Sequence, residues 1–278
     1  MSAPDPRLTL VREGLADVAL EGVVAAVRYI SPEPRACAAA EAPILSAADP
    51  AARQFDQLLH GEPFAVLAEE AGFAFGQAGR DGYVGWVAAA ALGPPPAAAS
   101  HRVSALRTYV FSDPDLKSTP RLALSFNALV TAEGEGEERF LPAAGGWIFA
   151  GHLAPVGEGF AGDPAAEAMR FLGAPYRWGG RDSLGLDCSG LVQQALYACG
   201  RACPRDSDQQ RALGAEVARG ELRRNDLAFW RGHVGLMLDA ERLLHANAHH
   251  MAVAVEPLEA ACARIVAAGG GEASFRRL

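Results

Sequence analysis

Three residues in the C-terminal half have the types that nucleophilic catalysis needs: Cys188, His233 and His245. Cys188 lies in "GLDCSGLVQQALYACG" (185–200), between an aspartate and a Ser-Gly pair and directly before a helical pattern. The unpaired N–H groups and the dipole of a helix start favour negative charge, so this position is expected to lower the pKa of the thiol. The same N–H groups can stabilise an oxyanion after attack on a carbonyl. The position therefore predicts a thiolate nucleophile.

A thiolate nucleophile needs a base, and the base needs a group that orients it. His233 opens the strand-like run "HVGLML", and His245 lies twelve residues further on, in the next such run. With a turn of odd length between them, both rings point to the same face of a hairpin, and His245 lies opposite Gly235. Gly235 then leaves room for an imidazole ring. A single strand histidine is more often structural, but two on one face beside a helix-start cysteine favour catalysis.

The other cysteines and histidines have structural or metal-binding interpretations. Cys199 falls on the apolar face of the helical pattern and, like Cys37 and Cys262, is expected to be a core thiol. Cys199 and Cys203 form a C-x₃-C pair, but no second pair follows, which argues against zinc. "HANAHH" (245–250) holds three histidines, yet neighbouring strand residues point to opposite faces and the H-E-x-x-H arrangement is missing. We expect neither a metal nor a cofactor.

The composition indicates about two or three domains with real hydrophobic cores. Of the 278 residues, 50% are hydrophobic and 21% charged, and the net charge is −8. An acidic chain argues against a nucleic-acid or anionic-membrane surface. "MSAPDPRLTLVREG" carries charges too closely spaced for a signal peptide, and no apolar run reaches the roughly 20 residues of a membrane helix. The expected location is the cytoplasm, where the five cysteines stay free thiols.

The elements that position the chemistry fall into four predicted segments. Residues 1–34 form a lead segment that mixes helical and extended patterns. Residues 35–95 and 96–158 each hold short strands separated by turns, with "GPPPAAAS" as a linker between the two segments. Each ends in an aromatic-rich strand, "GYVGWV" and "GGWIFAGHL", which predicts two related small β-barrels. Residues 159–278 read as two helices and then an antiparallel meander, an α+β pattern.

Three motifs in this last segment resemble those of the NlpC/P60 cysteine peptidases. They are "PYRWGGRDSLGLDCSGLVQQALYACG", "RRNDLAFWRGHVGLML" and "LLHANAHHMAVAVEPLE", and together the resemblance covers about residues 163–260. The two barrel segments resemble bacterial SH3 domains, the first through "QLLHGEPFAVLAE" and "DGYVGWV", the second through "GGWIFAGHLAP". The resemblance implies a papain-like NlpC/P60 catalytic domain preceded by two small SH3-like β-barrels.

This resemblance also implies roles for single residues. Cys188 corresponds to the nucleophile, His233 to the general base and His245 to the third, orienting residue. Tyr176, in "PYRWGG", resembles the family tyrosine near the oxyanion site, although an aromatic that merely packs beneath the helix fits the residue nearly as well. The motifs are especially similar to those of the γ-D-glutamyl-L-diamino-acid endopeptidases. That similarity implies hydrolysis of the γ-D-Glu–diamino acid bond of murein stem peptides with a free N-terminal L-Ala, in cell-wall peptide recycling.

A free ammonium group needs a carboxylate and hydrogen-bond acceptors. Asp187 and Ser189 flank the candidate nucleophile, and Ser207 in "CPRDSDQQ" matches a further acceptor position of the family. In the resembling enzymes the first SH3-like domain narrows the cleft, and Tyr83 and Asp56 are the candidates for that role. The alternatives are a helix N-cap for Asp187 and a barrel-core aromatic for Tyr83.

Two other functions remain open at this stage. One is a weakly catalytic or non-catalytic scaffold that binds cell-wall peptides through its SH3-like pair, although the intact Cys188, His233 and His245 argue against it. The other is a thiol amidase or acyltransferase on the same fold. In the main interpretation the partner is a murein-derived peptide, L-Ala-γ-D-Glu followed by lysine or diaminopimelate, with no nucleic acid and no membrane.

Overall fold

The chain forms two compact units in the computed structural model, which describes residues 4–95 and 98–278. The units divide between Val156 and Gly157, shortly before the predicted start of the catalytic segment at residue 159. Residues 1–3 of the predicted lead segment lie outside the described residues. So do residues 96 and 97, at which the predicted division between the barrels falls.

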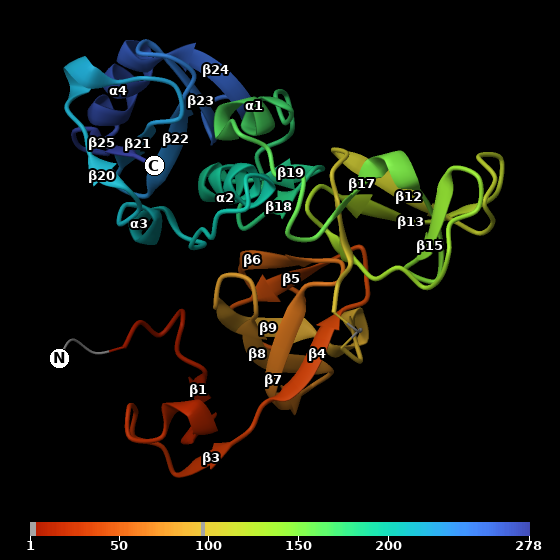
Figure 1. Ribbon diagram of the computed structural model, residues 1–278. Coiled ribbons are helices and arrows are strands. Elements are labelled where there is room, and N and C mark those ends of the chain that lie inside the picture. Colours follow the sequence, from red (N-terminus) through yellow and green to blue (C-terminus); the bar gives the residue numbers. More distant parts are fainter. Residues whose placement is uncertain (1–3, 96–97) are drawn as a thin grey trace. The chain divides into compact units, whose positions relative to one another are not determined.

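The lead segment consists of short strands and one 3₁₀ turn, so its mixed pattern belongs to extended structure with a single helical turn. The elements are β1 (Val11–Arg12), β2 (Leu15–Asp17), η1 (Val18–Leu20) and β3 (Arg28–Ile30), and the three strands form a small sheet (Figure 1). Leu10 is buried in a cluster with four residues of the first barrel, namely Leu45, Leu67, Phe75 and Trp86. This cluster attaches the segment to the barrel.

The first barrel is a single seven-stranded sheet with the order β10-β4-β7-β8-β9-β5-β6. Its strands are β4 (Glu33–Cys37), β5 (Glu41–Leu45), β6 (Gln54–Leu59), β7 (Pro63–Glu70), β8 (Phe73–Ala78), β9 (Val84–Ala88) and β10 (Leu92–Gly93). Strands β7 and β9 fall on the runs "QLLHGEPFAVLAE" and "DGYVGWV" of the first predicted barrel. Ile44, Leu58, Phe64 and Val87 fill the core, and Tyr83 is buried among them.

The second barrel is built from two smaller sheets, β13-β12-β16-β15 and β14-β11-β17. The strands are β11 (His101–Val103), β12 (Arg107–Phe111), β13 (Pro120–Ser125), β14 (Leu129–Val130), β15 (Phe140–Ala143), β16 (Gly146–Phe149) and β17 (Leu153–Pro155). In both barrels the aromatic-rich strand leads into one 3₁₀ turn and then the last strand; the turns are η2 (Ala89–Ala91) and η3 (Ala150–His152). This shared ending fits the predicted relation between the two segments.

The C-terminal unit is built on a six-stranded sheet with the order β20-β25-β21-β22-β23-β24, accompanied by helices (Figure 1). Before α2 come α1 (Pro164–Met169), β18 (Arg181–Asp182) and β19 (Gly185–Leu186). The elements from α2 onwards are α2 (Cys188–Ala198), α3 (Ser207–Gln210), β20 (Ala215–Glu216), η4 (Arg219–Glu221), β21 (Leu227–Trp230), β22 (His233–Met237), β23 (Arg242–Asn247), β24 (Ala252–Pro257), α4 (Leu258–Ala267) and β25 (Ser274–Arg277). The two helices and the meander follow the prediction, whereas α4 and β25 were not predicted.

Helices α2 and α4 hold the sheet between them. Leu258, Ala261 and Cys262 of α4 pack on Trp230 and Met237, which share one face of the sheet. Strand alternation places Val234 and Leu236 on the other face, and α2 contacts β22 and β23 there. Every residue of α2 is buried, so the predicted one-sided apolar pattern understates its burial. Cys199 caps the end of α2 and is only half-buried, contrary to the core position expected for it.

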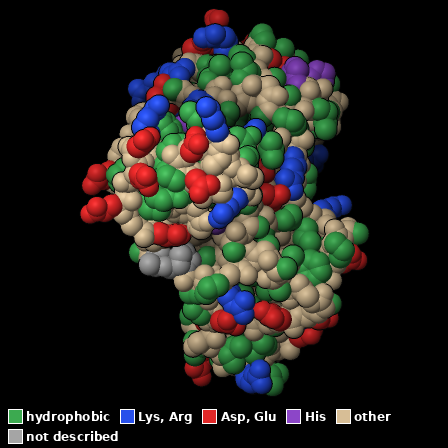
Figure 2. Space-filling model, turned by 90° about the vertical axis from the view of Figure 1, so that its right-hand side faces the viewer, with side chains coloured by type: hydrophobic (Ala, Val, Ile, Leu, Met, Phe, Trp, Pro, Cys, Tyr) green, Lys and Arg blue, Asp and Glu red, His purple; other side chains and the backbone are tan. Residues whose placement is uncertain are grey.

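The surface features agree with the acidic composition. On the face shown in Figure 2, acidic and basic side chains are interspersed and form no basic stripe. Within residues 4–95 and 98–278, no helix combines the length and the apolar character needed to span a bilayer. All five cysteines are free thiols.

Candidate active site

Cys188 is the first residue of α2, and the side chain of Asp187 caps that helix. Asp187 Oδ1 accepts from the Gly190 N–H at 2.8 Å, as an N-cap residue does. Burial and the neighbouring Asp187 carboxylate raise the pKa of the Cys188 thiol to about 12. Backbone N–H groups of Val234 and Ser189, together with the charge of Arg205, act in the opposite direction but do not outweigh these causes. The predicted lowering of the thiol pKa is therefore wrong for the free protein, because a helix start inside a packed core is not solvated.

His233 and His245 meet on one face of the β22–β23 hairpin, as their spacing predicts. His233 Nε2 and His245 Nδ1 share a hydrogen bond of 2.8 Å, and their ring centroids lie 5.0 Å apart. The strand register pairs Leu236 with Leu244, and continuing it places Gly235 opposite His245. A Cβ on Gly235 would lie 3.1 Å from the Cβ of His245 and 2.7 Å from Leu243 Cδ1. Glycine is therefore required at 235 for the two rings to lie together.

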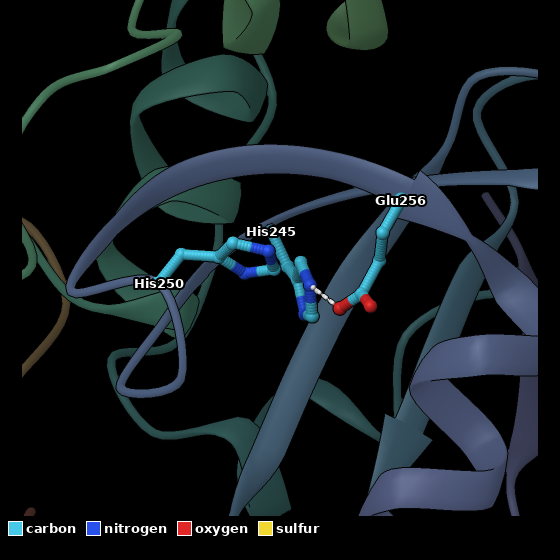
Figure 3. Close-up of side chains that lie close together, drawn as sticks. All are labelled: His245, His250 and Glu256. Carbon is cyan, nitrogen blue, oxygen red and sulfur yellow. Dashed lines mark hydrogen bonds and ion pairs between the residues drawn. The ribbon is translucent and has the colours of Figure 1, made fainter.

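Glu256 of β24 extends this chain of hydrogen bonds through its bond to His245, drawn in Figure 3, and fixes the direction of the chain. Glu256 Oε1 lies 2.7 Å from His245 Nε2 and also accepts from a guanidinium N–H of Arg264. A carboxylate only accepts, so His245 donates from Nε2 and, as a neutral ring, accepts at Nδ1. His233 must then donate from Nε2, which leaves the lone pair of its Nδ1 available. Glu256 therefore selects the His233 tautomer that can act as a base.

Both imidazoles stay neutral across the physiological range. Burial first, and then the positive charges of nearby groups, lower the pKa of His233 to about 3. Burial and the charge of Arg264 lower the pKa of His245 to about 3. A protonated His245 would donate from both nitrogens and reverse the bond to His233. The lowered pKa of His245 thus preserves the direction that Glu256 sets.

His245, His250 and Glu256 also offer possible metal-ligand atoms, which lie within 4.8 Å of one another. His245 Nε2 and Glu256 are already joined by the hydrogen bond drawn in Figure 3. His250 Nδ1 lies 2.9 Å from Asn247 Oδ1, and the guanidinium of Arg264 on Glu256 opposes a second cation. The donors are therefore committed to hydrogen bonds, and this arrangement fits histidine orientation better than metal binding.

Asp187 has a second partner in Arg205, a fully buried arginine. Arg205 Nη2 lies 2.6 Å from Asp187 Oδ2 and Nη1 lies 3.0 Å from Oδ1, so the pair is bidentate. Arg205 Nη1 also donates to Ser189 Oγ at 2.8 Å, and Gly179 N–H donates to Asp187 Oδ2 at 2.9 Å. The capping role considered for Asp187 is thus present, combined with a buried ion pair beside Cys188.

The other predicted site residues lie either in the catalytic unit or in the first barrel. Tyr176 lies near the thiol, since burial first and then the charges of Cys188 and Asp187 raise the pKa of its phenol. Ser207 is the first residue of α3, which contacts α2. Tyr83 and Asp56 belong to the first barrel, where they are 4% and 0% exposed. Tyr83 therefore occupies a core position, and the substrate contacts proposed for these two residues remain predictions.

Sequence reasoning missed Glu256, Arg264 and Arg205. For Glu256 a signal existed: in the motif "LLHANAHHMAVAVEPLE", strand alternation places Ala252, Ala254 and Glu256 on one face, and Ala254 pairs with His245. A lone carboxylate on that face is a candidate partner for an orienting histidine. Arg264 lies on the unpredicted α4, and Arg205 lies in a loop whose pattern carries no signal.

A buried cysteine at the start of a helix, with its thiol against the N–H of Val234 in the strand that opens with the oriented His233, is the arrangement of a papain-like cysteine hydrolase. Residues 173–264 match the NlpC/P60 family, and residues 44–92 match the bacterial dipeptidyl-peptidase SH3 domain. The chain therefore carries an NlpC/P60 domain and a bacterial SH3 domain, which confirms the resemblance seen in the sequence for the catalytic segment and for the first barrel. The predicted α+β fold of the catalytic domain is confirmed, and curated relatives of this domain carry the names of peptidases.

Curated relatives support this assignment over part of their length. The γ-D-glutamyl-L-lysine dipeptidyl-peptidase of Bacillus subtilis is 35% identical over 97 residues, 32% of this chain and 33% of that protein. Dipeptidyl-peptidase 6 of Lysinibacillus sphaericus is 36% identical over 81 residues, which is 29% of this chain and 30% of the relative. The matches thus span about a third of these relatives.

A solved structure extends the similarity to most of the chain. An NlpC/P60 family protein from Bacillus cereus superimposes with a TM-score of 0.73 at 18% sequence identity. The match covers 88% of this chain and 99% of that one. At this identity the comparison shows a shared fold over most of the chain.

Proposed function

We propose that the protein is a cysteine peptidase that hydrolyses the γ-D-Glu–diamino acid bond of murein stem peptides with a free N-terminal L-Ala. The observation that carries the proposal is the ordered chain His233–His245–Glu256, together with the hydrogen bond of the Cys188 thiol to the N–H of Val234, the residue after His233. A nucleophile, a base held in one tautomer and a buried group that orients the base are the parts that acyl transfer requires. The name of the Bacillus subtilis relative, γ-D-glutamyl-L-lysine dipeptidyl-peptidase, supports the choice of bond.

In the proposed reaction, Cys188 Sγ attacks the γ-carbonyl carbon of D-Glu while His233 Nδ1 takes the thiol proton. Because the thiol of the free protein is protonated, the proton moves as the C–S bond forms. N–H groups at the start of α2 and the hydroxyl of Tyr176 stabilise the oxyanion. The imidazolium formed at His233 is stabilised by Glu256 through His245.

Collapse of the tetrahedral intermediate breaks the C–N bond, and His233 gives its proton to the leaving amine of the diamino acid. The dipeptide remains on Cys188 as a thioester. Water then attacks the thioester carbonyl, with His233 as base, and its proton returns to the sulfur as L-Ala-D-Glu leaves. His233 keeps its hydrogen bond to His245 both as a neutral imidazole and as an imidazolium.

The polar groups that flank Cys188 are proposed to select substrates with a free N-terminal amine. Asp187 and Ser189 lie on either side of Cys188, and Ser207 opens the neighbouring α3. A buried carboxylate favours an ammonium, and the hydroxyl oxygens accept its hydrogen bonds. The Asp187–Arg205 pair holds this carboxylate in place and shares its charge, so replacement of Asp187 is expected to disturb both the helix start and the selection.

The same proposal includes a role in recycling cell-wall peptides in the cytoplasm. A requirement for a free L-Ala amine suits released peptides, because in the intact wall this nitrogen is acylated. The net charge of −8 also gives little attraction to an anionic wall. Fractionation of cells, with detection of the endogenous protein in the cytoplasmic fraction, tests this part.

The decisive experiment incubates the full chain with L-Ala-γ-D-Glu-L-Lys, with its diaminopimelate counterpart and with the N-acetylated forms of both. Release of L-Ala-D-Glu from the free peptides only, and its loss in Cys188→Ala, is the expected result. Cleavage that survives in Cys188→Ala would overturn the mechanism. Binding without cleavage would favour a peptide-binding scaffold, and faster action on N-acetylmuramoyl-L-alanine or on esters would favour an amidase or acyltransferase.

A further inference from the structure

Arg264 of α4 ends the chain of hydrogen bonds that begins at His233. Its Nη2 donates to Glu256 Oε1, the same oxygen that accepts from His245 Nε2 at 2.7 Å. The side chain of Glu256 is only 11% exposed and that of Arg264 is 28% exposed. A carboxylate so far from water requires a compensating cation, and the guanidinium supplies that charge.

The packing of α4 holds the guanidinium in this place. The apolar face of the helix packs against the sheet, and α4 contacts β23 and β24, the strands that carry His245 and Glu256. Arg264 lies three residues after the buried Ala261, so helical spacing places it beside that face. An arginine suits such a position because it stays charged at every physiological pH and its planar head donates in fixed directions.

Several elements place charged or titratable groups around the rings of His233 and His245. They are Glu256 of β24, Arg264 of α4, Asp187 before α2, and His249 and His250 of the turn between β23 and β24. The charge of Arg264 opposes protonation of both rings, whereas Glu256 and Asp187 favour protonation of His233. Arg264 is the permanent cation of this set, because the histidines are charged only when protonated.

An additional proton on His245 would disable the base. His245 would then donate from both nitrogens, so His233 would have to accept at Nε2 and carry its own proton on Nδ1. Nδ1 is the atom that takes the thiol proton in the proposed reaction. A carboxylate without its counter-charge would favour this state, since a nearby anion stabilises an imidazolium.

We propose that Arg264 is a positioning residue of the peptidase: it neutralises Glu256 and so keeps the two histidines in their catalytic tautomers as the pH falls. The inference rests on the proposed function and deepens it, because it assigns the group that sets the acid limit of activity. Glu256 alone would orient His245 and also attract a proton to it. Glu256 together with Arg264 orients the ring without attracting the proton.

The first test compares pH profiles of kcat/KM for the wild type, Arg264→Met and Arg264→Lys on the tripeptide that the wild type cleaves. Methionine keeps an unbranched apolar stem but removes the charge, whereas lysine restores the charge. The loss in kcat/KM of Arg264→Met should grow as the pH falls, and its acid limb should lie about one to two pH units above that of the wild type. Arg264→Lys should reverse most of this shift.

The matched control is Arg219→Met, which removes the partner of the exposed Glu259 on the same helix and should leave the profile unchanged. Circular dichroism at each pH restricts the comparison to folded protein. A profile of Arg264→Met that superimposes on that of the wild type would overturn the inference. So would an equal loss at every pH that Arg264→Lys does not restore, since that result leaves Arg264 only the packing of α4.

A second measurement needs no substrate. Nitrogen–proton correlation spectra of the histidine side chains of the full chain report the tautomer and the proton state of each ring, with His233→Asn and His245→Asn for assignment. In the wild type the neutral His245 should persist to the lowest pH at which the protein stays folded, because burial and then Arg264 lower its pKa to about 3. In Arg264→Met the ring should take up a proton about one to two pH units higher.

A His245 that titrates alike in both proteins would overturn the inference and leave the proposed peptidase activity standing. A shift of the titration without cleavage of any tripeptide would refute the proposed function and retain the effect of Arg264 on the histidines.

Discussion

The Cys188 thiol is subject to opposing influences at the start of α2. N–H groups favour the thiolate, while the packed surroundings and the Asp187 carboxylate favour the thiol, and the second set prevails. His233 is likewise held neutral. The free protein thus holds Cys188 as a thiol and His233 as a neutral imidazole, and the charges of catalysis appear during attack on the substrate.

Alkylation of Cys188 by iodoacetamide should still accelerate at alkaline pH. Since only the thiolate reacts and its pKa is raised to about 12, the rate is expected to rise about tenfold per pH unit between pH 7 and pH 9.5, without levelling off. Mass spectrometry of the Cys188 peptide follows the reaction, and Cys188→Ser reports labelling of the other thiols. A rate that is already level near pH 6 would indicate a preformed thiolate–imidazolium pair and contradict this prediction.

Replacement of Glu256 by Gln should slow catalysis without removing the nucleophile or the base. A glutamine can donate to His245 Nε2, which reverses the hydrogen bonds and gives His233 the wrong tautomer. In a serine protease triad the wrong tautomer of the histidine costs about 10⁴-fold in kcat. Here the glutamine can also turn its carbonyl oxygen to accept from His245 Nε2, which preserves the correct tautomer part of the time. A loss of about 10²-fold in kcat is therefore expected. Steady-state kinetics on the tripeptide measure the loss.

The matched control is Glu259→Gln, an exposed residue of α4 that pairs with Arg219. It should leave kcat unchanged, because Glu259 takes no part in the histidine chain. An unchanged kcat in Glu256→Gln as well would show that the tautomer is fixed by other groups.

At the scale of elements, the hairpin of β22 and β23 brings the rings of His233 and His245 together because its register places Gly235 opposite His245. Alternation and the parity of the turn were sufficient to predict this arrangement from the sequence. They could not predict that Glu256 and Arg264 join the two histidines. That prediction needs the register of β24 and the packing of α4, and α4 follows the last recognised motif without a clear periodic signal.

Gly235→Ala should therefore impair both stability and turnover. The added Cβ would press on Leu243 and on the backbone side of His245, so β23 must shift. We expect a loss of about 1–3 kcal/mol in the free energy of unfolding. Because a displacement of roughly 1 Å at a catalytic group costs about 10²-fold, kcat should fall by that order.

Gly220→Ala serves as the control, since nothing lies within 4 Å of a Cβ there. Urea denaturation and tripeptide kinetics on both variants separate the two effects. Wild-type kcat in Gly235→Ala would mean that the hairpin absorbs the methyl group without moving His245.

For the whole molecule, burial of two neutral histidines links folding to pH. Composition and motif order were enough to predict the domain classes and the fold. The pKa of Cys188 was mispredicted because the burial of α2 on all sides arises from tertiary packing. The buried Arg205 was missed for the same reason, as nothing in the loop sequence distinguishes it from a surface arginine.

The catalytic unit should lose stability as the pH falls below about 6.5. Unfolded histidines bind protons there, whereas His233 and His245 do not until about pH 3, so acid favours the unfolded state. Each histidine contributes up to about 1.4 kcal/mol per pH unit in this interval. Urea unfolding at pH 7.0 and pH 5.0 measures the fall, and His245→Asn, which cannot titrate, should show a smaller one. An equal fall in both proteins would assign the acid sensitivity to other groups.

The burial that keeps a proton on Cys188 also bears on how the protein withstands oxidants. Peroxides convert thiolates, and much more slowly thiols, to sulfenic acid. A resting Cys188 that is almost entirely thiol should therefore survive oxidative conditions under which an exposed low-pKa cysteine is lost. Its sensitivity would rise only while a bound peptide draws the proton to His233, which makes inactivation by peroxide depend on turnover.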